Sequence, residues 1–194
     1  MRATGPTVHF PARLSVSLHE RRCRTVPPQT GAWSSIHSSV TAAAHASYVL
    51  TVAVMVRSAG ESDVDGICRV CTEGYRATYT GLLPPEVIER TIAEFYVPQR
   101  VASELAASPP GWLGYLVAVD RESVVGAAGG GMIGDDAGEL FVIYVDPARK
   151  GEGIGTMLLV SVTEQLLTHG AKEMWASVQK GNAMGISSTS PEDS

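Results

Sequence analysis

A glycine-rich segment, Lys150–Gly155 (KGEGIG), lies between a predicted strand and a predicted helix. Glycines in such a turn let the backbone curl so that successive N–H groups point at one place. The first N–H groups of a helix also lack partners within the helix, and the helix dipole gives this end a partial positive charge. The segment is therefore suited to binding an anion such as a pyrophosphate, although tight strand–helix packing would use glycines as well.

Two common phosphate-binding motifs do not fit this segment. A Walker loop needs Gly-Lys followed by Ser or Thr, and the sequence contains no such triplet. The dinucleotide-binding fingerprint GxGxxG, counted from Gly151, needs glycine at the position that Thr156 occupies. Any phosphate site here must belong to another class.

The cysteines do not predict a metal or redox site. Cys68 and Cys71 form a CxxC pair, but no second Cys or His pair follows at zinc-ligand spacing. On a helix both side chains would face the core, together with Val64, Ile67 and Tyr75. With Cys23 the chain has only three cysteines, too few for a disulfide framework, so we expect a reducing compartment and a cytoplasmic protein.

Charge is distributed unevenly along the 194 residues. Residues 1–54 carry five Arg and one acidic residue, whereas residues 55–194 carry 10 basic and 19 acidic residues. This acidic balance argues against a nucleic-acid partner, because phosphate contacts need clustered Lys and Arg. Hydrophobic residues make up 44% of the chain, which is typical of a globular protein.

From Met55 onward the hydrophobic spacing predicts alternating helices and strands. A strand, a helix and a strand at the end of this series form a βαβ unit, so we expect an α/β fold with a mixed sheet. The predicted helices begin near Val64, at Pro85 and at Gln99, and a fourth covers Gly153–His169; the predicted strands are Leu113–Val119, Val124–Met132, Glu139–Val145 and Glu173–Val178.

The N-terminal region lacks this regularity. In residues 1–39 a short alternation of Leu14, Val16 and Leu18 indicates at best one strand without an obvious partner. Residues 40–56 are the only membrane candidate, but they are short and polar for a span, so we do not expect a membrane protein. We expect residues 1–54 to be a disordered or non-native extension. An organelle transit peptide is the alternative.

The run LFVIYVDPARKGEGIGTMLL resembles the signature of the GNAT superfamily of N-acetyltransferases. Lys150, Gly153 and Gly155 occupy the signature positions, with Lys in place of Arg or Gln. Met55–Glu61 resembles the opening strand of that family, TYTGLLPPEVIE its substrate-side loop and VQKGNAMGI the end of its next strand. The resemblance covers residues 55–186 and implies a GNAT-like acyl-CoA N-acyltransferase fold.

The resemblance implies a site for acetyl-CoA as co-substrate. It would lie where the strand ending at Val145 separates from the strand ending at Val178, with its pyrophosphate on the amides of Gly151–Thr156. The pantetheine arm would pair with the backbone of the first of these strands. The implied cofactor-binding residues are Ile143, Tyr144, Val145, Lys150, Gly151, Glu152, Gly153, Ile154, Gly155, Thr156 and Asn182.

In this family an amine attacks the thioester directly, and a backbone amide stabilises the oxyanion. Glu139 is the candidate general base, because some relatives place a carboxylate at the start of this strand; the alternative is a solvated side chain beside a turn. Asn182 matches an asparagine that is frequent in the family, but it could equally cap a helix. The expected acceptor is a small-molecule or peptide amine, and a homodimer is compatible with the sequence.

The C-terminus departs from the family pattern. Relatives usually continue with an aromatic pair, including a tyrosine that protonates the leaving thiolate, and then with one or two strands. Here the chain ends in the polar tail of residues 187–194, with Ser188 and Thr189 at the aromatic positions, and Tyr144 is no obvious substitute. We therefore expect a missing C-terminal strand region and an unpaired sheet edge.

Three functions follow from these observations. The first is an N-acetyltransferase that acts on a primary amine, impaired by a C-terminal truncation. The second is a non-catalytic CoA-binding or regulatory domain. The third is either an unstable fragment or a domain completed by another chain.

Overall fold

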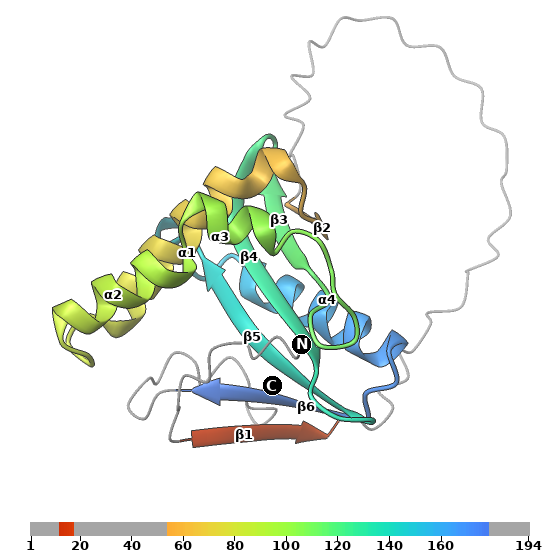
Figure 1. Cartoon of the computed structure of the whole chain (residues 1–194). Coiled ribbons are helices and arrows are strands. Elements are labelled where there is room, and N and C mark those ends of the chain that lie inside the picture. The colour runs from red at the N-terminus through yellow and green to blue at the C-terminus, as the bar shows by residue number, and fades with distance from the viewer. Residues whose placement is uncertain (1–11, 18–53, 179–194) are drawn as a thin grey trace, which may run out of the picture.

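The computed structural model describes residues 12–17 and 54–178 (Figure 1). They form one six-stranded sheet with the strand order β1-β6-β5-β4-β3-β2. The strands are β1 (Ala12–Ser17), β2 (Met55–Ser58), β3 (Tyr115–Asp120), β4 (Ser123–Met132), β5 (Ala137–Val145) and β6 (Glu173–Val178); the helices are α1 (Val64–Tyr79), α2 (Pro85–Phe95), α3 (Pro98–Ser103) and α4 (Ile154–Thr168). Two 3-10 turns, Glu61–Asp63 and Pro147–Arg149, precede α1 and α4.

The sheet is mixed, as the sequence predicts. Strands β2 to β5 pair antiparallel, β5 and β6 pair parallel, and α4 connects these two parallel strands. The predicted βαβ unit and the α/β architecture are therefore confirmed. Strand β6 has the predicted bounds, and α2 begins at Pro85, whose fixed φ suits the first helical position.

Two layers of helices enclose the sheet. Helix α4 packs on one face through Leu158, Val162 and Leu166. Helices α1 and α3 pack on the other face, where residues such as Ile67 and Val101 are fully buried (Figure 1). Burial of apolar surface on both faces is the main source of stability for such an arrangement.

Helix α3 is shorter than predicted, ending at Ser103 rather than at residue 107. The carbonyl of Glu104 accepts a hydrogen bond from the indole Nε1 of Trp112 at 2.7 Å. The residue after α3 thus binds the side chain of Trp112, which lies in the loop before β3. The helical periodicity of the sequence does not indicate this contact.

The N-terminal strand has a partner that the sequence did not indicate. Strand β1 pairs antiparallel with β6 along its whole length, from Ala12 opposite Val178 to Ser17 opposite Glu173. The expectations of a partnerless strand and of an unpaired edge on β6 are therefore wrong. Pairing between segments about 160 residues apart leaves no local turn signal in the sequence, which is why it was missed.

Most of the other N-terminal expectations lie outside the described residues. Of the membrane candidate, residues 40–56, only residues 54–56 are described, and β2 begins within them. No helix in the described part of the chain is long and apolar enough to cross a membrane.

Candidate active site between the separating strands

Strands β5 and β6 separate part-way along their length. Their parallel pairing covers only Ala137–Leu140 of β5, whereas β5 continues for five further residues to Val145. At the separation point the register with β4 shifts, because Gly129 lies opposite Val142 and Gly130 opposite Leu140. Phe141 is left without an opposite residue, as in a β-bulge, which bends a strand. In Figure 1 the two arrows start together and diverge toward their heads.

The separated part of β5 has one edge that no described strand covers. The N–H of Asp146 donates to the carbonyl of Val125 at 2.9 Å, so the backbone of residue 146 faces β4. In an antiparallel pair the direction alternates, so Tyr144 also faces β4, whereas the N–H and C=O groups of Ile143 and Val145 face the opening. Of the three predicted strand residues, two therefore offer backbone groups to a ligand in the opening.

Tyr144 has a packing role. Its ring lies edge-on to Tyr75 and Tyr96, with centroids 6.1 and 5.9 Å away, and it sits so close to Gly74 that a Cβ there would lie 2.8 Å from it. Burial raises the pKa of Tyr144 well above its ordinary value. The ring thus takes part in the packing between β5, α1 and the end of α2.

The glycine-rich turn leads from β5 into α4. Gly151 and Gly153 have φ angles of +87° and +78°, which residues with a side chain adopt at a cost of about 1–2 kcal/mol. The first helical hydrogen bond runs from the Met157 N–H to the Gly153 carbonyl, so the N–H groups of residues 154–156 have no partner within α4. Among the described residues, no side chain caps this helix start and no acid lies in its first turn.

The members of the predicted phosphate segment contribute in different ways. Ile154 is buried in the core beneath α4, so its backbone alone can reach a ligand. Gly155 has no positive φ, and a Cβ there would lie at an ordinary 3.7 Å from Val145. Thr156 and Lys150 are exposed at the surface of the turn.

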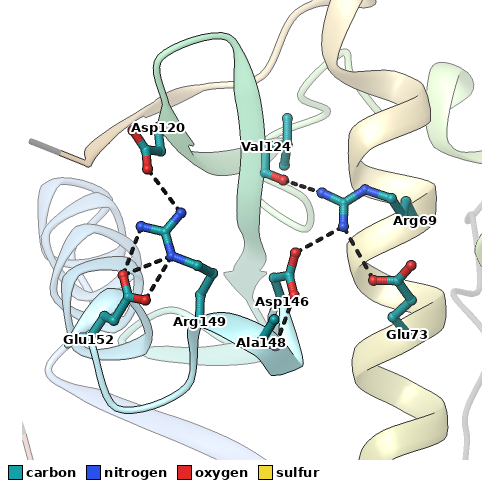
Figure 2. Close-up of polar contacts among 8 residues, drawn as sticks. All are labelled: Arg69, Glu73, Asp120, Val124, Asp146, Ala148, Arg149 and Glu152. Carbon is teal, nitrogen blue, oxygen red and sulfur yellow. Dashed lines mark hydrogen bonds and ion pairs between the residues drawn. The ribbon is translucent and has the colours of Figure 1, made fainter. Parts of the chain in front are cut away.

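An ion-pair network holds this turn against the rest of the fold (Figure 2). The Arg149 guanidinium binds Asp120 at 2.9 Å and Glu152 at 2.7 Å. Its hydrogen bonds lower the pKa of Glu152. The Glu152 carboxylate is thus occupied by Arg149, and its backbone N–H is the group that can serve an anion.

A second arginine fixes the end of β5 (Figure 2). Arg69 of α1 binds Asp146 at 3.0 Å and donates to the Val124 carbonyl at 2.6 Å. Partial burial raises the pKa of Asp146, but hydrogen bonds from the Ala148 N–H and from Arg69 outweigh it and hold that pKa below its ordinary value. Sequence reasoning missed these partners because residues 69, 120 and 149 are far apart in the chain.

Glu139 lies in the paired part of β5, ahead of the opening. Its carboxylate accepts a hydrogen bond from Ser177 Oγ at 2.8 Å, and the residue opposite it on β6 is Trp175. Glu139 is half-buried and forms no ion pair with the described residues. The structure thus places the predicted base on the strand that borders the opening, with a hydroxyl holding its orientation.

The remaining candidates fall into two groups. Asn182 and the tail with Ser188 and Thr189 lie outside the described residues. Cys68 and Cys71 lie on α1, and burial raises the pKa of both thiols. Within the described ranges no group of three or more His, Cys, Asp or Glu residues could hold a metal ion.

Comparison with known proteins identifies the family. The model of the acetyltransferase (GNAT) family matches residues 76–186, which is more than half of the chain. The chain belongs to this family. It is an acetyl-CoA-dependent N-acetyltransferase, and the resemblance noted in the sequence is confirmed.

Individual GNAT proteins show the same relationship. The uncharacterized N-acetyltransferase YuaI of Bacillus subtilis (strain 168) is 30% identical over 146 residues, covering 72% of this chain and 80% of that protein. The crystal structure of PaiA N-acetyltransferase from Thermoplasma acidophilum, in complex with coenzyme A, is 25% identical with a TM-score of 0.64, covering 70% and 85% of the two chains. The ribosomal-protein-S18-alanine N-acetyltransferase of Escherichia coli shares the fold at 18% identity and a TM-score of 0.50, covering 70% and 74%.

Proposed function

We propose that this GNAT acetyltransferase binds acetyl-CoA along the open edge of β5 and transfers the acetyl group to a primary amine. One observation carries the proposal: the edge of β5 that loses its partner after Leu140 leads, through the short turn Pro147–Arg149, into the glycine-rich start of α4. Two sets of unpartnered backbone groups therefore follow one another along the chain. The set on β5 is suited to an amide-bearing arm, and the set at the start of α4 is suited to a pyrophosphate.

The turn supports the pyrophosphate half of the proposal. A Cβ built at Gly151 or Gly153 would meet nothing within 4 Å, so an anion can approach the backbone there. The free N–H groups at the start of α4 add hydrogen-bond donors and the positive end of the helix dipole. Glu152 would oppose an anion, but its carboxylate is paired with Arg149.

The edge of β5 supports the other half. The pantetheine arm carries amide groups, which can pair with the N–H and C=O groups of Ile143 and Val145 as an added strand would. Such pairing would fix the thioester near the separation point. In the crystal structure of the PaiA enzyme the bound molecule is coenzyme A, which is compatible with this placement.

The reaction needs a proton acceptor and an electrostatic contact. The amine nitrogen attacks the thioester carbonyl carbon, a C–N bond forms, and the C–S bond then breaks to release the CoA thiolate. A backbone N–H of β5 would stabilise the oxyanion. The thiolate can take its proton from solvent, because thiols ionise near pH 8.5.

Glu139 is the proposed acceptor of the amine's proton. It lies four residues before Ile143, about 13 Å along the strand, so we assign the transfer through intervening water. The hydrogen bond from Ser177 orients its carboxylate. Proton acceptors of this kind contribute roughly 10²–10⁴-fold to a rate.

The test uses the full chain with acetyl-CoA and a panel of diamines, amino sugars and peptide N-termini, and follows release of the CoA thiol. We expect acetyl-CoA at about 100 times its Kd to raise the Tm by about 5–10 °C, and at least one amine to release CoA above the level without acceptor. Glu139→Gln should lower kcat/KM about 100-fold while the shift in Tm persists. Absence of both the shift and the transfer would contradict the proposal, and a shift without transfer would restrict it to binding.

A further inference from the structure

Phe141 is a large aromatic residue in an unusual position. It is the unpaired residue of the register shift in β5, at the point where the opening begins, and it is 48% exposed. Its ring stacks on that of Trp112, with centroids 6.3 Å apart and an interplanar angle of 29°. An exposed aromatic ring beside a proposed reaction centre is available to contact the acceptor.

Trp112, on which Phe141 stacks, is anchored by contacts of its own. Its Nε1 donates to the Glu104 carbonyl at 2.7 Å, and its ring meets Tyr115 edge-on at 5.0 Å. The ring also lies so close to Gly129 of β4 that a Cβ there would be 2.3 Å from it. We call the Phe141–Trp112 pair the aromatic platform. Trp112 has close contacts with the surrounding chain, and Phe141 is partly open to solvent.

Two carboxylates lie on the same side of the sheet as the platform. Leu140, Met174 and Ala176 pack beneath α4, so the alternation of side chains places Glu139, Glu173 and Ser177 on the opposite face. Trp112 packs against the core cluster of that same face.

These carboxylates lack a described basic partner. Neither Glu139 nor Glu173 forms an ion pair within the described part of the chain. Among the described residues their hydrogen-bond partners are neutral, Ser177 Oγ for Glu139 and Trp175 Nε1 for Glu173. These two carboxylates therefore attract a positive charge.

From this arrangement we infer that the aromatic platform selects an acceptor that carries a second positive charge on an aliphatic chain. The inference rests on the proposed function, since it assigns the acceptor class for that site. The aliphatic chain of the acceptor would lie across the exposed ring of Phe141, which attracts a cation. The carboxylates on the same face of the sheet would add to this attraction. An amine that carries an anion would be repelled.

The test compares two acceptors that differ only at the far end, 1,5-diaminopentane and 1-aminopentane. It uses the full chain, because β1 pairs with β6 and completes the sheet beside this site. We expect the wild type to favour the diamine in kcat/KM by about tenfold or more. Phe141→Leu keeps an apolar side chain but removes the ring, and should reduce that preference at least about threefold without changing the KM for acetyl-CoA. Phe141→Tyr should retain the preference.

Leu167→Ala is the matched control, because Leu167 is similarly exposed (46%) but lies on α4, on the other side of the sheet. Binding of the two amines to the CoA-bound protein, measured by calorimetry, gives a readout that does not need turnover. The inference is overturned if the wild type binds and acetylates both amines equally, or if Phe141→Leu leaves the preference unchanged. A chain that binds the diamine selectively but does not acetylate it would contradict the proposed function and not the platform.

Discussion

Helices α1 and α4 begin in different electrostatic surroundings. Before α1, the Asp63 carboxylate accepts the Gly60 N–H at 2.8 Å and two hydrogen bonds from Arg57 at 2.6 and 2.9 Å. Asp65 adds a negative charge in the first turn of that helix. Before α4, Gly153 provides no side chain, and the first turn has no acid. In the part of the chain that the structure describes, no side chain caps either helix start, so the difference lies in the acidic side chains, which are present at the start of α1 and absent from the first turn of α4.

The difference indicates what each end is for. Negative charge near a helix start stabilises the helix by about 0.3–1 kcal/mol, so a start without it forgoes that stability. An open start beside an uncovered strand edge is instead suited to a ligand that carries negative charge. Changes at α1 should therefore affect stability, and changes at α4 should affect binding of acetyl-CoA.

The largest effect is expected at the start of α1. Arg57 holds the pKa of Asp63 below its ordinary value, mainly through their hydrogen bonds, and Asp63 is only 5% exposed. Asp63→Asn should lower the free energy of unfolding by about 2 kcal/mol in urea titrations at pH 7, with the acetyl-CoA Kd unchanged.

The same pair predicts a dependence on pH. Because the pKa of Asp63 is lowered in the folded state, its contribution is complete above about pH 4 and is lost as the pH falls through the lowered pKa. Wild type should therefore lose more stability than Asp63→Asn between about pH 5 and pH 2. Parallel losses in the two proteins would contradict this assignment.

The second prediction compares the two ends of α4. Gly153 and Gly170 both have positive φ, +78° and +90°, and a Cβ at either would meet nothing within 4 Å. Alanine at each position should cost about 1–2 kcal/mol of stability through the backbone alone. Only Gly153→Ala should weaken acetyl-CoA binding, by about tenfold, because Gly170 lies at the opposite end of the helix. Equal Kd values for the two variants would argue against a phosphate site at the helix start.

The smallest effect is expected from Asp120→Asn, which removes one of the two carboxylates on Arg149. If Arg149 positions the turn, acetyl-CoA should bind about threefold more weakly, while stability changes by less than about 1 kcal/mol. If Arg149 instead contacts phosphate directly, freeing it should strengthen binding. The sign of the change in Kd, measured by calorimetry at low salt, distinguishes these roles.

Much of the fold could be predicted because its signals are local. The spacing of apolar residues predicted α2, β6 and the mixed sheet, and the breakers at Pro85 and Gly170 marked helix ends. The cofactor segment was also local, since positive φ at Gly151 and Gly153 is a requirement of the turn itself. The role of Glu139 and the contribution of Asn182 stay predictions.

The sequence by itself determined the order of the elements and the family, because periodicity and the glycine-rich segment are properties of neighbouring residues. Only the tertiary structure decided that β1 pairs with β6, that Arg149 binds Asp120, and that Phe141 stacks on Trp112. Each of these contacts joins residues about 30 to 160 positions apart. Such contacts form only when the sheet brings distant segments together, and a single sequence carries no local pattern that specifies them.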